Sequence, residues 1–483
     1  MQKVSEKYKG LPKEVKASLW FLICSFLQRG ISFITTPIFT RLMSTSEYGA
    51  FGTFNSWMNI VMVIVTLDLS AGVYTQGIVK FEKERAEFTS SIQGLTLCLT
   101  IAWTTIYTIF SDFFNRLMSL SAIQMYFMLF IVWSTSVFTI WAAEQRVLLK
   151  YQTLVLLTIL TSILQPCISI LLVIHNEDKV LARILGTVIV NLFCYAGLFI
   201  IHLLKGKQFI SINYWKYALA FNIPLIPHFL SQTVLNSSDR IMINIMVGES
   251  AAGIYTLGYS IAFIMGLFNT ALAQTINPWI FKKIRDNKTK DIPQVAYLML
   301  GIIGFINLLL IAFAPDAVRI FAPVTYRDAI WIIPPVAMSL FFVFMSFLFV
   351  DFEMYYEKTV YVTLSTLCSA VLNIVLNYIF IKKYGYFAAG YTTLVGYLVY
   401  AGMHFYFMNK TLVQKSAENV FDIGKLLIMS FTFLTVGLLL MFTYLLPAIR
   451  YSLLLCIGIL MCIFRKKIFK IANRIISIRK IES

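Results

Sequence analysis

The sequence of 483 residues is poor in charge, because only 13% of its residues are Asp, Glu, Lys or Arg. A typical soluble domain carries about 25% of such residues. Hydrophobic residues make up 59% of the chain, and a single water-soluble core could not hide that much apolar surface. The scarcity of charge therefore excludes an ordinary soluble protein and predicts an all-α integral membrane protein.

Motifs for catalysis and for metal binding are also missing. The four histidines are dispersed without zinc spacing, and the seven cysteines form no C-x-x-C and stand in apolar stretches, as small core residues do. The chain has no G-x-x-x-x-G-K-[ST] phosphate loop, no H-E-x-x-H and no nucleophile elbow. We therefore expect no enzyme activity, no metal, no cofactor and no hydrolysis of ATP by this chain.

Apolar runs long enough to cross a bilayer recur from end to end. They predict about 14 transmembrane helices, at residues 17–40, 49–73, 88–110, 122–143, 152–174, 184–204, 217–247, 252–277, 294–314, 329–350, 359–381, 386–408, 423–446 and 448–464. The connections between these runs are too short to hold a soluble domain.

Lys and Arg are unevenly distributed over the connections. If the N-terminus is cytoplasmic and the helices alternate, 29 of the 40 basic residues fall on the cytoplasmic side, nine fall outside and two fall within spans. Basic residues gather in cytoplasmic loops, so this bias predicts that both termini are cytoplasmic and explains the net charge of +17 without nucleic acid. Two features fit this topology less well: a cytoplasmic loop expected to hold Asp351, Glu353 and Glu357, and the pair Lys382–Lys383 outside.

Two similar segments follow the first and the seventh predicted helix. They are Met43-Ser-Thr-Ser-Glu-Tyr-Gly-Ala-Phe51 and Val247-Gly-Glu-Ser-Ala-Ala-Gly-Ile-Tyr255, and their glycines lie 204 residues apart. Parallel repeats are a transporter design, so we expect an N-terminal lobe at 1–210, a C-terminal lobe at 211–410, and two extra helices with a basic cytoplasmic tail at 411–483. The alternative is that turns rich in small residues resemble one another by chance.

Arg29 and Arg240 are the two basic residues that lie well inside predicted spans. A guanidinium near the middle of a bilayer costs at least ~2.5–3.5 kcal/mol, so such a residue usually faces water or a partner. Each arginine lies on or beside a row of polar residues at helical spacing. The first helix carries Ser25, Gln28, Ser32, Thr36 and Thr40, and the seventh carries His228, Gln232, Asn236, Arg240 and Asn244.

Two interpretations of these rows remain open. In the first, the polar side chains bind neighbouring helices and Asp239 pairs with Arg240 as a structural contact. In the second, the rows line a central water-filled cavity in which the two arginines bind a phosphate or a carboxylate. The second interpretation predicts a substrate-binding set of Arg29, Arg240, Gln28, Asn55, Asn59, Gln232 and Asn236.

Few ionisable residues are available to couple transport to an ion gradient. Asp239 and Glu144 are the candidates, with a proton or another cation as the coupling ion and a structural ion pair as the alternative. Pro224 and Pro227 remove hydrogen bonds from the first turns of the seventh helix. They predict a kink, which is either a hinge at a cytoplasmic gate or static.

In two stretches the chain resembles the polysaccharide-unit (O-antigen) flippases of the multidrug/oligosaccharidyl-lipid/polysaccharide exporter superfamily. The stretches run from Pro37 to Gly49 and from Pro224 through Asp239-Arg240 to Tyr255. The resemblance implies two six-helix lobes around a central cavity, with two further C-terminal helices. It also implies gate or family-motif roles, in fold or gating, for Pro37, Arg41, Tyr48, Gly49, Pro224, Pro227 and His228.

The same resemblance implies a function. The chain is expected to flip a polyprenyl-diphosphate-linked oligosaccharide, of the O-antigen or capsule type, from the cytoplasmic to the periplasmic leaflet of a bacterial inner membrane by alternating access. The expected partners are that glycan, membrane lipids and other glycan-assembly proteins, without nucleic acid. Two alternatives remain: an ion-coupled antiporter of drugs or organic cations, which would have an acidic cavity, and a membrane-embedded O-unit polymerase or ligase, which would have a large outer loop.

Overall fold

The computed structural model describes residues 13–415 and 418–463, and in these residues every regular element is a helix. The chain divides into two compact units, Met1–Gly253 and Ile254–Ser483. The basic tail expected at the C-terminus lies outside the described residues. The boundary between residues 253 and 254 separates two units that are each compactly packed. The lobe boundaries expected from the sequence repeat, at residues 210 and 410, stay a prediction.

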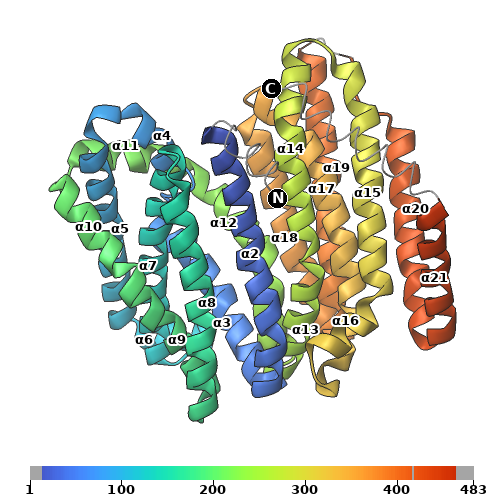
Figure 1. Ribbon diagram of the computed structural model, residues 1–483, viewed down its shortest axis with the longest axis horizontal. Coiled ribbons are helices and arrows are strands. Elements are labelled where there is room, and N and C mark those ends of the chain that lie inside the picture. Colours follow the sequence, from blue (N-terminus) through green and yellow to red (C-terminus); the bar gives the residue numbers. More distant parts are fainter. Residues whose placement is uncertain (1–12, 416–417, 464–483) are drawn as a thin grey trace, which may run out of the picture. The chain divides into compact units, whose positions relative to one another are not determined.

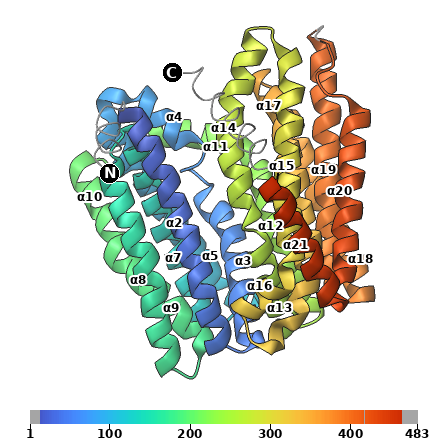
Figure 2. The ribbon, with the colours of Figure 1, turned by 45° about the vertical axis from the view of Figure 1, so that its right-hand side comes forward.

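The first unit holds the helices up to the start of α13 (Figures 1 and 2). They are α2 (Lys13–Leu42), α3 (Thr45–Thr66), α4 (Val73–Lys80), η1 (Glu82–Glu84), α5 (Arg85–Ile109), α6 (Ser111–Met118), α7 (Ala122–Val147), α8 (Tyr151–His175), α9 (Lys179–Cys194), α10 (Ala196–Gly206), α11 (Ile212–Asn222), η2 (Ile223–Leu225) and α12 (Ile226–Met246). In this unit α8 packs against both α2 and α9, and α12 packs along α3.

The second unit begins within α13 (Glu249–Ala262). It continues with α14 (Met265–Arg285), η3 (Thr289–Asp291), α15 (Ile292–Ala312), α16 (Ala314–Phe321), η4 (Val324–Trp331), α17 (Ile333–Tyr355), α18 (Thr359–Tyr384), α19 (Phe387–Gln414), α20 (Ile423–Phe442), η5 (Thr443–Leu445) and α21 (Pro447–Ile463). Here α17 packs against α14, α15 and α19, and 83% of its apolar window is buried. A helix that is apolar all round belongs in a core, and α17 is the core helix of this unit.

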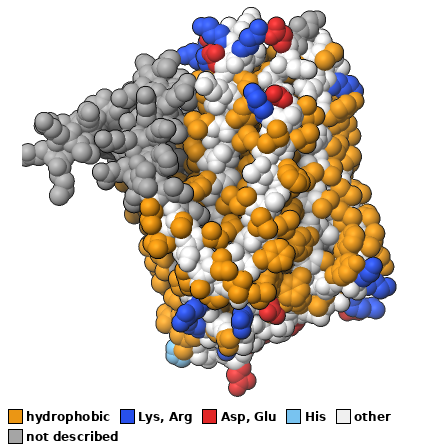
Figure 3. Space-filling model, turned by 90° about the vertical axis from the view of Figure 1, so that its right-hand side faces the viewer, with side chains coloured by type: hydrophobic (Ala, Val, Ile, Leu, Met, Phe, Trp, Pro, Cys, Tyr) orange, Lys and Arg blue, Asp and Glu red, His pale blue; other side chains and the backbone are white. Residues whose placement is uncertain are grey.

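Eleven of the described helical segments are long and apolar enough to cross a membrane. The other three predicted spans fall on α2, α19 and α21, which are also helical, α21 with only 17 residues. On the face shown in Figure 3, hydrophobic side chains cover the middle while charged side chains gather toward the two ends. The prediction of an all-α membrane protein is confirmed.

The cysteines do not all behave as predicted. Cys24 is buried, but Cys167, Cys368 and Cys456 are exposed. The prediction that they are core residues is therefore wrong for these three. Their helices are apolar on the outside as well as toward the core, as expected of a protein solvated by lipid.

Two helices of the first unit begin with the same local device. Ser44 and Ser121 each accept a hydrogen bond from a backbone N–H three residues on, and their own N–H groups donate to the side chains of Glu47 and Gln124. Each of these capping boxes stabilises its helix by about 1 kcal/mol. They fix where α3 and α7 begin.

The seventh predicted helix is longer than expected and is broken. It starts at Ile212 and not at residue 217, and η2 interrupts it between α11 and α12. Pro224 lies in η2 and Pro227 lies in the first turn of α12, where the missing N–H groups break the helical ladder. The predicted kink is confirmed, and whether it acts as a hinge stays a prediction.

The acidic segment expected as a loop after residue 350 is largely helical. α17 continues to Tyr355, so that Asp351 and Glu353 lie inside it, and both are buried. The helix ends just before Glu357, whose φ of 57° is left-handed. The loop prediction was wrong for Asp351 and Glu353, because a drop in hydropathy ended the expected span although the helix continues.

Candidate functional site

The predicted polar row of the seventh helix lies on α12, along the edge of its packed face. His228, Gln232, Asn236 and Arg240 are all half-buried. Leu235 and three serines on adjoining positions of the same helix are fully buried. The row is therefore partly accessible, as a binding surface must be.

Arg240 and Asp239 have different surroundings on α12. Successive residues on a helix are about 100° apart, and Asp239 is only 1% exposed whereas Arg240 is half-buried. The Nη1 atom of Arg240 lies 3.5 Å from the backbone oxygen of Asn236, one turn back in the row. Arg240 thus belongs to the row and Asp239 to the packed face. A coupling or pairing role for Asp239 stays a prediction.

The other predicted binding residues lie on α2 and α3 of the same unit. Gln28 on α2 is exposed, and on α3 Asn55 is half-buried and Asn59 is exposed. Arg29 lies one residue after Gln28 on α2, and its side chain is outside the described residues. The structure thus places the predicted set on three helices of one unit, and its role in binding stays a prediction.

The two repeated segments pack directly against each other within the first unit. A Cβ atom on Gly49 would lie 1.9 Å from the backbone oxygen of Glu249, and a Cβ atom on Gly253 would lie 2.0 Å from that of Thr45. Because Thr45 and Glu249 are also 204 residues apart, the two contacts are reciprocal, like those across a two-fold axis. The hydroxyls of Thr45 and Ser250 complete the junction at 2.8 Å. Only glycine permits this approach.

Pro37, Arg41 and Tyr48, the other motif residues of the first stretch, make contacts around the end of α2. Arg41 is exposed, and its Nη1 atom donates to the backbone oxygen of Pro37 at 2.8 Å. The guanidinium of Arg183, from α9, lies over the rings of Phe39, Tyr48 and Phe51, at 3.7, 5.4 and 3.8 Å from their centroids. These contacts indicate a structural part for Arg41 and Tyr48.

The break before α12 is held by Asn222. Its side chain accepts a hydrogen bond from the N–H of Val73 at 2.9 Å and donates to the oxygen of Leu67 at 2.7 Å. Asn222 is completely buried, and a Cβ atom on Gly72 would lie 2.4 Å from its Oδ1. The end of α11, just before the break, is therefore tied to the turn between α3 and α4.

Glu144, the other predicted coupling residue, ends a buried polar chain. The Nε2 atom of His202 lies 3.2 Å from the Glu144 carboxylate, and the amide nitrogen of Gln93 lies 3.1 Å from Nδ1 of His202. Gln93 also donates to the backbone oxygen of Val137 at 3.2 Å. Sequence reasoning missed Gln93 and His202, which come from helices far from Glu144 in the chain.

A second glutamate–histidine pair lies in the second unit. The Nδ1 atom of His404, on α19, lies 3.0 and 3.1 Å from the two carboxylate oxygens of Glu353 on α17. Both side chains are 0% exposed. Sequence reasoning missed this pair too, although an acidic residue at the end of an apolar run is the kind of signal that marks a polar site in a membrane protein.

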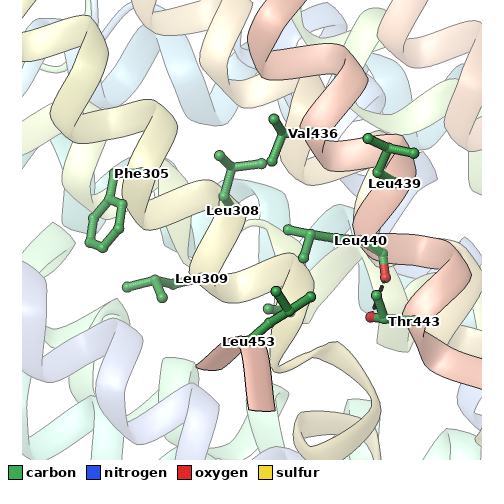
Figure 4. A pocket seen from close by; sticks show the side chains of 9 residues that line it. Phe305, Leu308, Leu309, Val436, Leu439, Leu440, Thr443 and Leu453 are labelled. Atoms are coloured by element: carbon green, nitrogen blue, oxygen red, sulfur yellow. Dashed lines mark hydrogen bonds between the residues drawn. The ribbon is translucent and has the colours of Figure 1, made fainter. Parts of the chain in front are cut away.

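Two hollows described in the second unit are apolar. One of about 320 Å³ lies between α15, α20 and α21, and Figure 4 shows its leucine-rich lining with the side chain of Thr443 bonded to the oxygen of Leu440. Another, of about 580 Å³, lies between α18 and α19. Their linings consist mainly of apolar side chains, which can contact hydrocarbon but offer few polar groups to a ligand. Among the described residues no group of His, Cys, Asp and Glu is arranged to hold a metal ion.

Comparison with known proteins agrees with this architecture. The family model described as polysaccharide biosynthesis protein matches residues 15–284, more than half of the chain, and the MatE model matches residues 224–379. Two proteins of Haemophilus influenzae are similar in sequence. An uncharacterized membrane protein is 23% identical over 308 residues, which are 60% of this chain and 71% of that protein. The Lsg locus putative protein 1 is 20% identical over 298 residues, or 57% and 68%.

Solved structures share the fold. The lipid II flippase MurJ, in an inward closed conformation, aligns with a TM-score of 0.67 at 16% identity, over 93% of this chain and 99% of MurJ. An inward-facing multidrug resistance MATE family transporter of the MOP superfamily aligns with a TM-score of 0.61 at 14% identity, over 81% and 96%. At these identities the likeness establishes the fold alone.

Proposed function

The chain belongs to the polysaccharide biosynthesis protein family of multi-pass membrane transporters and flippases, and from that premise we propose that it flips a polyprenyl-diphosphate-linked oligosaccharide by alternating access. The repeat unit would be of the O-antigen or capsule type, and it would pass from the cytoplasmic to the periplasmic leaflet of a bacterial inner membrane. The chain would catalyse no reaction. Other glycan-assembly proteins would supply and consume the glycan.

One observation carries this proposal: a half-buried row of amides and one arginine on a membrane-spanning helix. A guanidinium can give two parallel hydrogen bonds to a phosphate, and neutral amides suit the hydroxyls of sugars. Arg29 and Arg240 would bind the diphosphate, and Gln28, Asn55, Asn59, Gln232 and Asn236 would bind the sugars.

The test is surface glycan in the native host, with the chromosomal copy of the gene replaced. Arg240→Ala is expected to lower surface glycan at least tenfold, a factor that corresponds to about 1.4 kcal/mol. Arg240→Lys should export more glycan than Arg240→Ala and less than the wild type, because lysine keeps the positive charge but cannot form the two parallel hydrogen bonds of a guanidinium. Arg116→Ala is the matched control, because Arg116 is an exposed arginine of the same unit outside the row.

Arg29→Ala is tested beside these variants. If Arg29→Ala and Arg240→Ala both export glycan at the full rate, while immunoblots show equal protein, the anion site is wrong.

The match of residues 224–379 to the MatE model favours a second candidate. An antiporter of drugs or organic cations would raise drug tolerance and would leave surface glycan unchanged when its gene is deleted. A deletion strain that loses surface glycan at unchanged drug tolerance supports the flippase, and the reverse pattern supports the antiporter.

The proposed orientation, with both termini in the cytoplasm, has its own experiment. A membrane-impermeant thiol reagent added to intact cells should label Lys382→Cys and spare Lys283→Cys, in a background without native cysteines. The opposite labelling would reverse the topology.

A further inference from the structure

The two glutamate–histidine pairs occupy corresponding places in the two halves of the chain. Glu144 lies on α7 and His202 on α10, which correspond to the fourth and sixth predicted spans, and Glu353 lies on α17 and His404 on α19, which correspond to the tenth and twelfth. The two glutamates are 209 residues apart and the two histidines are 202 apart, close to the 204 residues that separate the repeated glycines. The pairs are therefore counterparts in the repeat.

The histidines of the two pairs differ in how many of their ring nitrogens are engaged. In the first unit, Nε2 of His202 faces Glu144 and Nδ1 faces the amide of Gln93, so both nitrogens have partners. In the second unit, Nδ1 of His404 donates to Glu353, and Nε2 is buried with no hydrogen-bond partner among the described residues. The ring of Tyr400 packs edge-on against His404, with centroids 4.4 Å apart. A neutral His404 thus keeps one vacant, enclosed acceptor.

The charges around the two glutamates also differ. Glu144 is 20% exposed at its side chain, and Lys205 and Lys150 act on it together with His202. The partner of Glu353 is the ring of His404, and among the described residues no lysine acts on Glu353 as Lys205 and Lys150 do on Glu144. A carboxylate beside a neutral imidazole would bury one net negative charge there, which is costly in a medium of low dielectric constant.

The other charged groups on the elements around α17 do not compensate Glu353. They are Asp351 on α17 itself, Lys282, Lys283 and Arg285 on α14, Lys382 and Lys383 on α18, Lys410 on α19, Lys425 on α20, and Arg327 and Asp328 on η4, while α15 carries none. In the described part of the chain none of these forms an ion pair with Glu353, and Lys283 and Arg285 pair with Asp291 and Asp286. One added proton, on Nε2 of His404 or on the carboxylate, would make the pair neutral.

We propose that Glu353 and His404 form a proton-binding site that couples proton movement to transport, whereas Glu144 and His202 form a permanently charged structural counterpart. The proposal of coupling rests on the transport function proposed above, while proton binding stands apart from it. The bound species is a proton because the site offers one carboxylate and one imidazole, too few oxygen ligands for a hard metal cation. Uptake converts imidazole and carboxylate, with a net charge of −1, into imidazolium and carboxylate or their neutral tautomer.

The experiment for proton binding uses the full chain in lipid vesicles. Infrared difference spectra between about pH 5 and pH 8, the range over which a histidine titrates, should contain carboxyl or imidazole bands from this pair. Glu353→Gln should remove those bands, and so should the double variant Glu353→Gln/His404→Gln, which keeps a hydrogen-bonded pair without charge. Glu144→Gln, the matched control, should keep them. Bands that persist in Glu353→Gln, or that vanish in Glu144→Gln, would overturn the assignment.

The experiment for coupling measures surface glycan with and without a protonophore. Export by the wild type should fall at least fivefold when the proton gradient collapses, and export by Glu353→Gln should be low and no longer respond. A Glu353→Gln strain with full, protonophore-sensitive export would overturn coupling. If the chain exports no glycan at all, the flippase proposal fails while the infrared result still decides the proton site.

Discussion

The first and the second unit bury a carboxylate beside a histidine in the same pair of repeat positions, but they complete the pair in opposite ways. Around the first pair the structure adds two side-chain amides, Gln145 at the Glu144 carboxylate and Gln93 at the His202 ring, together with two lysines and partial exposure to solvent. Beside the Glu353–His404 pair it adds the aromatic ring of Tyr400, and among the described residues one nitrogen of the His404 ring has no hydrogen-bond partner. A repeat can therefore preserve where a polar pair lies while changing what the pair can do.

Removing each histidine in turn should give the largest difference between the two units. His404→Leu removes the hydrogen-bond partner of the buried Glu353 carboxylate, and losing one partner of a buried pair costs about 3–5 kcal/mol. His202→Leu leaves Glu144 with two lysines and partial exposure, and polar contacts between membrane helices average only about 0.6 kcal/mol. Unfolding in mixed micelles at pH 7.5 measures both costs.

The same pair of variants gives a pH signature. A neutral carboxylic acid tolerates burial without a partner better than a carboxylate does, so His404→Leu should regain stability as the pH is lowered and His202→Leu should change little. Equal costs for the two variants at every pH would remove the asymmetry between the units.

At the glycine junction, in contrast, the two repeated segments are equivalent. In both Gly49→Ala and Gly253→Ala the new methyl group meets a backbone oxygen at 2 Å or less, and the backbone must move. Overpacking of this kind costs about 1–3 kcal/mol, and we expect similar losses for the two variants. Gly301→Ala, where nothing lies within 4 Å, should be neutral or stabilising by about 0.5–1 kcal/mol. Losses that differ severalfold would show that the junction is not two-fold.

Helix positions and helix packing were unequally predictable from the sequence. The spans, the break at Pro224 and the similarity of the two glycine segments could be predicted, because each depends on residues that are close together in the chain. The pairing of Glu353 with His404 depends on which turn of α17 faces α19, 51 residues later. An apolar run reveals its length but not its buried face, so the carboxylates at its end were assigned to a loop.

The roles of individual basic residues were also not predictable from the sequence. In the predicted topology, Arg183 is one of the nine basic residues that lie in outer connections. In the structure its guanidinium lies over three aromatic rings of the first unit, and the nearby Lys179 donates to the backbone oxygen of Leu42 at 2.7 Å. Such cations stabilise the end of α2, a role that no count of charges can reveal.

Asp68 shows the effect of burial on a carboxylate that, unlike Glu144 and Glu353, does not form a pair with a histidine among the described residues. It lies in the turn after α3 with a left-handed φ of 46°, is half-buried, and has no hydrogen bond to its side chain among the described residues. Burial raises the pKa of this carboxyl above its ordinary value. A raised folded-state pKa means that the native protein holds the proton more tightly than the unfolded chain does. Stability is therefore lost as the pH rises through the folded-state pKa.

Asp68→Asn is accordingly expected to flatten this part of the pH profile and to stabilise the chain slightly above that pKa, by about 0.5 kcal/mol or less, since the site is partly solvated. Asn also accepts the left-handed backbone, so the turn itself should not change. Unfolding between about pH 4 and pH 8 measures the effect, with the exposed Asp112→Asn as control. If Asp68→Asn loses stability at high pH relative to the wild type, the Asp68 carboxylate has a favourable partner, and burial alone does not decide how this chain holds its acidic groups.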